Sequence, residues 1–375
     1  MEGRGRKVKE GRNKKEEGVG GEKKIPWERM NEGKFLVTGG AGFIGSHIAS
    51  RLLEEGYETI VLDDLSLGKP ENVPKGARLL TYPCELALIP KDLYGLRGIF
   101  HLGMPSSSPM YRERPGLAGL TVREFEVILR LAEREGCRLV YASTSSLYNG
   151  NPIPWHEGLP IHATDIYTET RYWMERLARV YASLYGVESV GLRFFSVYGP
   201  GERHKGRFAN MISQMLWSLK RGEEIVLYGD GSQTRDFVWV EDVADACLKA
   251  MYARLPSLSE SSSESASESE SSMVSSSASS SSPDSSGLCE VFNVGYGRAY
   301  SFNEVLSMLS EALGVKPKVR YAENPIRNYV WHTLADTRKA ERLLGFKASV
   351  SLKEGIRRLV DSELITFVFQ SQKSL

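Results

Sequence analysis

The sequence has little net charge, few cysteines and no long apolar segment. Its 48 Lys and Arg residues balance 47 Asp and Glu, so the formal charge is +1. Bulk charge therefore favours neither a nucleic-acid partner nor an anionic membrane surface. No apolar run reaches the ~20 residues that a membrane-spanning helix needs. The charged first residues also lack the apolar core of a signal peptide, so we expect a cytoplasmic protein.

The few cysteines and histidines argue against disulfide and metal chemistry. Cys84, Cys137, Cys247 and Cys289 are widely spaced and form no CxxC pair. Thiols in this pattern are expected to be free and buried in a reducing cytosol. The histidines are scattered, and no metal-ligand cluster is predicted. With 41% hydrophobic residues in 375, the chain can bury a sizeable core in one large domain or two lobes.

Glycine, in contrast, is concentrated in one informative stretch. A short apolar segment, 35–37, is followed by Gly39, Gly42 and Gly45 and then by an amphipathic segment, 48–53. Glycines permit a tight turn and a close approach of the backbone to a ligand, and the N–H groups at a helix start favour an anion. The order of strand, glycine turn and helix therefore predicts a site for the pyrophosphate of a dinucleotide.

The residues after the next strand specify which dinucleotide. An apolar segment, 59–62, ends in Asp63 and Asp64, at about the ~20-residue distance expected from the glycines. A carboxylate there can accept hydrogen bonds from both hydroxyls of the adenosine ribose, and it would repel a 2′-phosphate. The sequence therefore predicts NAD rather than NADP. A glycine turn that binds nothing is the alternative, and the following acid argues against it.

The first half of the chain alternates short apolar runs with helical segments. This alternation predicts an α/β fold with a doubly wound parallel sheet (Rossmann) over residues 33–197. The expected strands are 78–82, 98–102, 138–142 and 187–195, and the expected helices are 122–135 and 168–184.

After Gly199-Pro200 the pattern changes. We expect a smaller C-terminal substrate lobe from residues 198–235 and 295–365, with 236–253 and 290–294 returning to the first domain. The expected elements are a helix over 208–220, a strand over 225–228, a helix over 241–252, a strand over 290–294, and a helix that begins at the capping box Ser301/Glu304 and ends at Gly314.

Two segments have compositions that cannot form a core. Residues 1–32 are rich in Lys, Arg, Glu and Gly, and residues 257–286 are mostly Ser with scattered Glu. The first composition predicts a disordered extension and the second a flexible, solvated insertion.

Two polar clusters are candidates for catalysis. Thr144 lies at the C-terminal end of a predicted strand, the edge where ligands bind in doubly wound sheets. Tyr167 and Arg171 are four residues apart and so share one face of a helix. A nearby fixed cation favours the phenolate, which suits Tyr167 to general acid–base chemistry. Alone, a Tyr/Arg pair at this spacing is better explained as ordinary helix surface, and Thr144 fits a common polar turn at a strand end. Together with an NAD site, the two clusters favour a function.

Taken together, these stretches resemble the extended short-chain dehydrogenase/reductase family, and within it the nucleotide-sugar epimerases of the UDP-glucose 4-epimerase type. The resemblance covers residues 34–365 outside the serine tract. It rests on the segments TGGAGFIG (38–45), HLGM (101–104), LRFFSVYGP (192–200), YGDGSQTRDF (228–237), NVG (293–295) and AD (335–336), with Thr144 and Tyr167 at the catalytic positions.

The resemblance implies an NAD-dependent enzyme that transiently oxidises C4 of a UDP-sugar, such as UDP-glucose/UDP-galactose or an N-acetyl form. In this family Thr144 would orient the sugar oxygen, Tyr167 would be the acid/base, and Arg171 would hold the ribose. The implied cofactor contacts are Gly39, Gly42, Phe43, Ile44, Gly45, Asp63, Asp64, Glu85, Leu86, Leu102, Tyr167 and Arg171. The implied substrate contacts are Ser106, Thr144, Ser196, Asn210, Tyr228, Arg235 and Arg327.

Several residues depart from the family pattern and keep alternatives open. Arg171 replaces a lysine, Thr121 replaces an asparagine, and Glu85 replaces an aspartate. An Arg-for-Lys exchange keeps the charge but not the compact ammonium, so a non-catalytic binding protein is one alternative. A reductase or a 4,6-dehydratase is another, although a dehydratase needs an acid pair where Ser145 and Ser146 stand.

The resemblance also implies a homodimer. Helices 122–135 and 168–184 would pair with a second copy as a four-helix interface, with Leu129, Trp173 and Tyr181 exposed for that contact. The alternative is that these apolar residues belong to the core.

The two low-complexity segments lead to the first prediction. Deleting residues 1–29, or replacing 257–286 with a short Gly/Ser turn, should leave folding and NAD binding intact, because neither segment can bury apolar area. Melting temperature and an NAD titration measure this. A large drop in melting temperature in either variant would show that the segment packs on the fold.

Overall fold

The structure is a computed structural model that describes residues 33–255, 288–326 and 328–372. The expectations for residues 1–32, for the serine-rich insertion 257–286 and for Arg327 lie outside these described residues.

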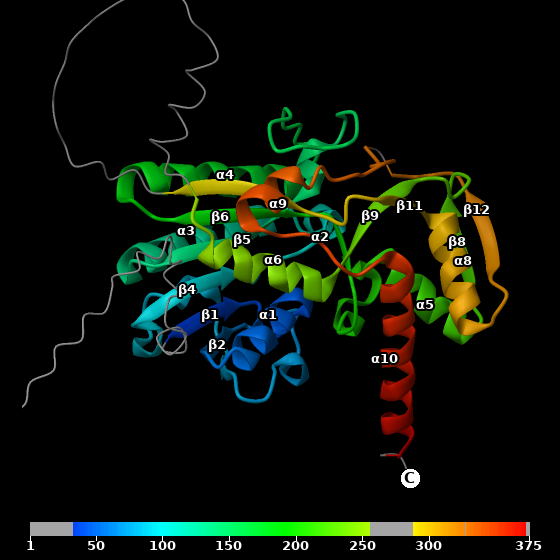
Figure 1. Cartoon of the computed structure of the whole chain (residues 1–375), viewed down its shortest axis with the longest axis horizontal. Coiled ribbons are helices and arrows are strands. Elements are labelled where there is room, and N and C mark those ends of the chain that lie inside the picture. The colour runs from blue at the N-terminus through cyan, green and yellow to red at the C-terminus, as the bar shows by residue number, and fades with distance from the viewer. Residues whose placement is uncertain (1–32, 256–287, 327, 373–375) are drawn as a thin grey trace, which may run out of the picture.

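The larger lobe is built on a seven-stranded sheet in which every pairing is parallel (Figure 1). The strand order is β10-β6-β5-β4-β1-β2-β3, so the chain starts in the middle and winds outward in both directions. The predicted doubly wound fold is confirmed. The strands are β1 (Lys34–Thr38), β2 (Glu58–Leu62), β3 (Arg78–Leu80), β4 (Leu96–His101), β5 (Arg138–Thr144), β6 (Ser189–Phe194) and β10 (Cys289–Val294).

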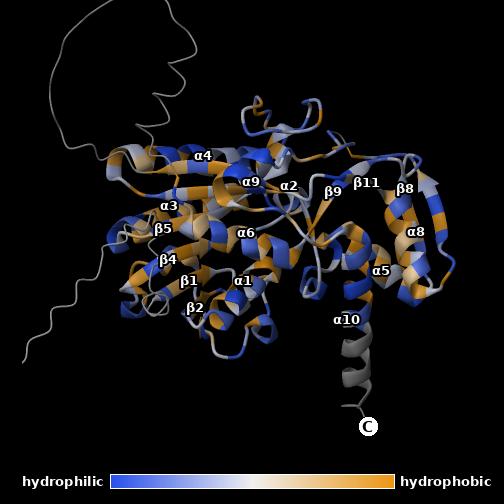
Figure 2. Ribbon diagram, viewed as in Figure 1, coloured by the Kyte–Doolittle hydropathy of each residue, from blue (hydrophilic) through white to orange (hydrophobic). Residues whose placement is uncertain are grey.

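Helices cover both faces of this sheet, which explains why its strands are almost continuously apolar (Figure 2). Successive side chains point to opposite faces, so Phe35 and Val37 belong to one core and Leu36 to the other. The first core is completed by α1 (Phe43–Glu54), α6 (Val240–Tyr252) and α9 (Arg338–Leu344), and the second by α3 (Leu117–Glu135) and α4 (Ile166–Tyr185).

Capping residues mark the start of α4 and the C-terminal ends of both α3 and α4. At the start of α4, the Asp165 side chain accepts a hydrogen bond from the Thr168 amide at 2.8 Å, and the Thr168 side chain caps in return. Both helices end at a glycine in the left-handed region, Gly136 for α3 (φ 59°) and Gly186 for α4 (φ 68°). Each helix begins earlier than expected, at Leu117 and at Ile166.

The smaller lobe has its own core around Tyr198, Phe237, Trp239 and Leu306. It contains a three-stranded sheet, β11-β9-β7, and a parallel pair, β12-β8 (Figure 1). Its elements are β7 (Ser196–Tyr198), α5 (Met211–Arg221), β8 (Glu224–Tyr228), β9 (Thr234–Trp239), β11 (Ala299–Ser301), α8 (Phe302–Leu313), β12 (Lys318–Ala322) and α10 (Leu352–Gln372). The predicted Ser301/Glu304 capping box begins α8.

Two segments belong to a different lobe from the one that we expected. Residues 236–239 were expected in the first domain, but they belong to β9 in the small sheet. Residues 338–346 were expected in the smaller lobe, but Ala340, Leu344 and Phe346 are buried in the core of the large sheet. Lys339 anchors this segment by donating to the Val291 carbonyl of β10 at 2.9 Å. The remaining division into lobes stays a prediction.

A buried ion pair connects α4 to the sheet. Both oxygens of Glu175 accept hydrogen bonds from Arg193 of β6, at 2.9 Å from Nε and 2.6 Å from Nη2. Glu175 also accepts from the Ser143 hydroxyl of β5 at 2.6 Å. On its other side, Arg193 Nη1 donates to the Tyr148 hydroxyl at 2.7 Å, which donates to Asn293 of β10 at 2.8 Å. This network locks the helix against three neighbouring strands.

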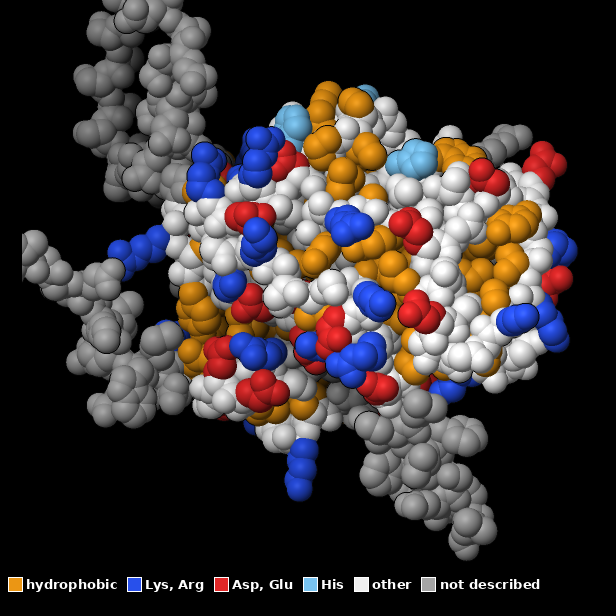
Figure 3. All heavy atoms as spheres, turned by 45° about the vertical axis from the view of Figure 1, so that its right-hand side comes forward, with side chains coloured by type: hydrophobic (Ala, Val, Ile, Leu, Met, Phe, Trp, Pro, Cys, Tyr) orange, Lys and Arg blue, Asp and Glu red, His pale blue; other side chains and the backbone are white. Residues whose placement is uncertain are grey.

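The surface mixes charges of both signs. On the face shown in Figure 3, Lys and Arg side chains lie beside Asp and Glu. Many form exposed ion pairs, such as Arg221 with Glu223 at 2.6 Å and Arg320 with Glu224 at 2.8 Å. In the part of the chain that the structure describes, no helix has the length and apolarity needed to cross a membrane.

Candidate active site

A cleft of about 890 Å³ lies at the carboxyl ends of the large sheet's strands and is lined by both lobes. It sits where β1 and β4 are neighbours and the strand order reverses, the position at which doubly wound sheets bind ligands. The larger lobe contributes the glycine turn, Asp63, Thr144 and Tyr167, while the smaller lobe contributes residues such as Asn210.

The glycine turn forms a cradle that larger side chains would fill. Gly39 has φ +68°, and a Cβ there would lie 2.6 Å from the Gly103 amide nitrogen. A Cβ on Gly45 would clash with the Gly39 carbonyl. Gly42 is the N-cap of α1 and has no side-chain cap, so the first N–H groups of the helix are directed at the cleft. This arrangement suits a pyrophosphate.

Asp63 supports this turn and also lines the cleft. Its carboxylate accepts hydrogen bonds from the Ala41 amide at 3.0 Å and from the Leu65 amide at 2.9 Å. Burial raises the pKa of Asp63, and the two amides oppose that shift. Because each carboxylate oxygen has a second lone pair, Asp63 can still accept from ribose hydroxyls.

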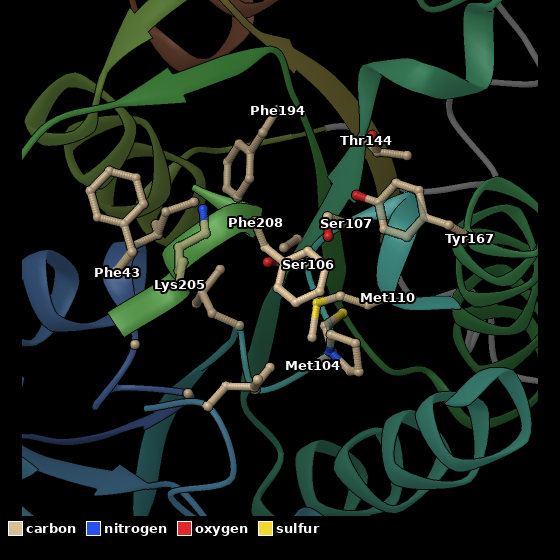
Figure 4. Close-up of a pocket in the computed structure, with 18 of the residues that line it drawn as sticks. Phe43, Met104, Ser106, Ser107, Met110, Thr144, Tyr167, Phe194, Lys205 and Phe208 are labelled. Atoms are coloured by element: carbon tan, nitrogen blue, oxygen red, sulfur yellow. The ribbon is translucent and has the colours of Figure 1, made fainter. Parts of the chain in front are cut away.

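Thr144 and Tyr167 face the same space. Thr144 ends β5, and its hydroxyl accepts from the Ser146 amide at 3.2 Å. Tyr167 is 9% exposed and packs against Tyr111, with ring centroids 5.5 Å apart. Figure 4 shows the phenolic oxygen of Tyr167 turned toward Thr144. A sugar hydroxyl bound here could reach both hydroxyl groups.

Arg171 lies behind Tyr167, as the four-residue spacing predicted. Its guanidinium carbon is 5.0 Å from the centroid of the Tyr167 ring, and the residue is only 2% exposed. Nη2 donates to the Pro105 carbonyl at 2.7 Å, and Nη1 contacts the sulfur atoms of Met104 and Met174. Nε has no hydrogen-bond partner among the described residues. Two of the three guanidinium nitrogens therefore already have partners within the protein.

The smaller lobe supplies another part of the cleft lining. Asn210 caps α5 by accepting from the Ile212 amide at 3.0 Å, and its Nδ2 donates to the Ser196 hydroxyl at 3.1 Å. Arg235 is held between the rings of Phe302 and Tyr329, 5.4 and 5.3 Å from their centroids. Asn210, Ser196 and Arg235 all line the cleft.

A 3-10 segment, η6 (Arg203–Phe208), crosses the mouth of the cleft. Lys205 Nζ lies 5.2 Å from the centroid of the Phe43 ring at the start of α1. Arg207 pairs with Glu113 across the cleft at 2.7 Å. Phe208 packs near Met110 and Tyr167, and Figure 4 shows it in the middle of the cleft. The helix expected from residue 208 begins only at Met211, and no element or role was expected for residues 203–207.

Most residues assigned from the sequence line this cleft, and a few do not. The lining includes Gly39, Gly42, Phe43, Ile44, Gly45, Asp63, Asp64, Leu102, Ser106, Thr144, Tyr167, Arg171, Ser196, Asn210 and Arg235. Glu85, Leu86 and Tyr228 are outside it: Glu85 forms an ion pair with Arg123, Leu86 is 42% exposed, and Tyr228 contacts the Tyr329 ring edge to face. The roles assigned to all of these residues stay predictions.

Several lining residues were missed, notably Met104, Glu124 and Lys205. Glu124 follows Thr121 by three residues on α3, so helical spacing alone could have drawn attention to it. Lys205 gave no such signal, because its position depends on how η6 folds over the cleft.

A parallel sheet with a glycine turn, and an acid at the end of its second strand, defines a dinucleotide-binding protein. A family model described as "NAD dependent epimerase/dehydratase family" matches residues 35–257. The chain therefore belongs to this family, and the cradle and Asp63 fit the NAD on which the family depends.

Individual relatives agree with this assignment. The solved UDP-glucose 4-epimerase of Thermotoga maritima, in complex with UDP-glucose, is 30% identical, with 89% of this chain and 99% of that chain covered and a TM-score of 0.76. The Thermus thermophilus UDP-glucose 4-epimerase, in complex with NAD, is 28% identical, with 88% and 98% covered and a TM-score of 0.71. The UDP-glucuronate 4-epimerase of Thermodesulfobacterium geofontis is 27% identical over 346 residues, 88% of this chain and 95% of that protein.

Asp63 leads to the second prediction. Asp63→Ala should weaken NAD binding by about tenfold and narrow the gap to NADP, because it removes the ribose acceptors and the repulsion of a 2′-phosphate. Isothermal titration with both cofactors measures this. Asp63→Asn is the control for the shape of the turn, since its amide oxygen can still accept from the Ala41 amide. Unchanged selectivity in Asp63→Ala would contradict the assignment.

Proposed function

We propose that this chain is an NAD-dependent 4-epimerase of a UDP-sugar, with UDP-glucose and UDP-galactose, or their N-acetyl forms, as substrates. The observation that carries the proposal is the pair formed by Tyr167 and Thr144, which both line the cleft, with the phenolic oxygen of Tyr167 turned toward Thr144 (Figure 4). Relatives named UDP-glucose 4-epimerase, solved with UDP-glucose or with NAD, support it.

In this proposal, the residues of the chain handle the proton and the orientation of the sugar. NAD, when bound, supplies reversible hydride transfer. Tyr167 takes the proton of the sugar 4-hydroxyl and later returns it, and Thr144 holds the same oxygen. The Arg171 guanidinium lies against the Tyr167 ring and helps to hold it in place. Arg235 and Asn210 contact the nucleotide diphosphate, and net redox change is zero.

A dehydratase is less well supported. Ser145 and Ser146 line the cleft directly after Thr144, where elimination of water needs an acid and a base. Serine hydroxyls do not titrate near neutral pH, so they cannot fill those roles.

A binding protein without turnover is the second candidate, and one observation favours it. Arg171 Nη2 is already bonded to the Pro105 carbonyl, so part of its capacity to hold a ribose is taken. The Nε atom has no partner in the described part of the chain but is itself buried, so it is not exposed to a ligand in the cleft. A panel of UDP-sugars, with products separated by chromatography, distinguishes the two candidates and identifies the sugar.

We also propose a cytoplasmic homodimer. All four cysteines are buried free thiols, which suits a reducing compartment. An apolar groove between α3 and α4 includes Val122, Leu177 and Trp173, which is 46% exposed. Leu129 and Tyr181, which we expected at this interface, are instead buried in the core of one chain, at 0% and 9% exposure.

The third prediction tests the acid/base. Tyr167→Phe removes the titrating proton but keeps the ring, so epimerisation should fall by ~10²-fold or more while NAD still binds. Conversion of UDP-glucose to UDP-galactose, followed by chromatography, gives the rate. If the variant were as fast as the parent, Tyr167 would not be the catalytic group.

Variants of Arg171 complete this test. Arg171→Lys keeps the positive charge and should preserve or raise activity, whereas Arg171→Met should impair turnover and cofactor retention, because it removes the cation that lies against the Tyr167 ring and would hold the ribose. A parent that is inert on every UDP-sugar, alongside an active Arg171→Lys, would favour the binding protein over the enzyme.

The fourth prediction concerns assembly. The parent should be a dimer at micromolar concentration, and Trp173→Glu should dissociate it, because a charge would be buried in an apolar interface. Light scattering measures the mass. Ile89→Glu, which changes a residue that is 72% exposed on another part of the surface, is the control and should remain dimeric. A monomeric parent would refute the proposal.

A further inference from the structure

One buried carboxyl group in the cleft has no role in the proposed reaction. Glu124 of α3 is 8% exposed and lines the cleft together with Asp64 and Cys84. Glutamate is rarely buried to this extent without a specific partner. The sequence assigned it no function, and its surroundings suggest one.

The position of Glu124 relates it to one part of NAD. In a doubly wound sheet the pyrophosphate lies at the glycine turn and the ribose at the acid after β2. The adenine ring must then lie beyond Asp63, where the cleft is walled by Pro83, Cys84 and the residues of α3. Glu124 enters this end of the cleft from α3.

The groups around Glu124 are mostly acidic. Asp64 faces it from the end of β2, and Glu85 faces it from the 3-10 turn η3 (Cys84–Leu86). Arg123, its neighbour on α3, is paired with Glu85. The backbone amide of Cys84 lies near the Glu124 carboxyl group and favours its charged form.

These surroundings favour the neutral acid. Burial, with the added repulsion of Asp64 and Glu85, raises the pKa of Glu124 to about 7, although the Cys84 amide and Arg123 oppose the shift. A large fraction of Glu124 is therefore protonated at neutral pH. The Cys84 thiol beside it stays neutral, because burial raises its pKa as well.

A protonated carboxyl group presents one O–H donor beside one carbonyl acceptor. Adenine presents the complementary pair, an N6 amino donor beside a ring-nitrogen acceptor, and the side-chain amides of Asn and Gln read adenine in this way. We propose that Glu124, in its protonated form, is an adenine-recognition residue of the NAD site. This inference rests on the proposed placement of NAD in the cleft. The alternative is that Glu124 only holds the Cys84 amide.

The pH dependence of binding separates these roles. If the protonated form binds adenine, affinity is fully present below the pKa of Glu124 and declines as pH rises through it. The Kd of the parent for NAD and for ADP-ribose should rise by about tenfold between pH 6 and pH 8.5. Glu124→Gln, which keeps a donor and an acceptor but does not titrate, should bind tightly with a flat profile. Glu133→Gln, an exposed site on the same helix, is the matched control and should follow the parent.

A modified cofactor provides a second readout that a structural role would not move. In 1,N6-etheno-NAD an added ring covers N1 and N6 of adenine. The parent should prefer NAD over this analogue by about tenfold or more. Glu124→Ala should lose most of that preference, and its melting temperature reports whether it folds.

The possible results distinguish a wrong role for Glu124 from a wrong proposed function. A Glu124→Gln profile that follows the parent's, or a Glu124→Ala variant with the parent's preference for NAD over the analogue, would overturn the role of Glu124. Equal weakening of both variants at every pH would do the same, because it marks a structural residue. If NAD and ADP-ribose do not bind the parent at all, the proposed function itself fails.

Discussion

The arrangement of the cleft depends on the buried ion pair between Glu175 and Arg193. Removing one member of such a pair leaves an uncompensated charge and typically costs about 3–5 kcal/mol, so this contact strongly constrains the position of α4. Glu175 lies four and eight residues after Arg171 and Tyr167, so the three share one helix face. Its bond from Ser143 ties that face to the residue next to Thr144. The relative positions of the phenol and the threonine hydroxyl therefore follow from an interaction that touches neither of them.

The smaller lobe meets this rigid unit through segments that cross the cleft. Asp236 of β9 is fully buried and accepts hydrogen bonds from the amides of Ala335, Tyr296 and Gly297 at 2.7–3.0 Å. Neighbouring Arg235 is thereby held in the cleft lining, while Lys205 of η6 contacts Phe43 beside the glycine turn. Both lobes thus shape the cleft.

Much of this could be predicted from the sequence, because the signals were local. The glycine turn, Asp63, the strand end at Thr144 and the four-residue spacing of Tyr167 and Arg171 each depend on a few neighbouring residues. The expectations that were wrong depended on packing between segments that are distant in the sequence. Leu129 and Tyr181 were expected on the surface because helical spacing does not show how deeply a helix is buried. The segment of α9 was expected in the smaller lobe because the contact between Lys339 and β10 joins residues that are distant in the sequence. Glu124 was missed because its raised pKa depends on Asp64, which follows β2, and on Glu85 of η3, and the sequence does not show that these residues lie near it.

The place where the serine-rich insertion joins the fold has a consequence of its own. The chain leaves the described fold after Leu255, beyond the end of α6, and returns at Leu288, just before β10. Arg138, at the start of β5, donates to carbonyls at the end of α6, and β10 runs parallel to β6. Both junctions therefore lie at the amino edge of the sheet, and the cleft lies at the carboxyl edge. Over evolutionary time such a tract can lengthen, shorten or change its charge without disturbing the chemistry. For the same reason, the junction is a natural point for attaching a fluorophore or a surface tether to a working enzyme.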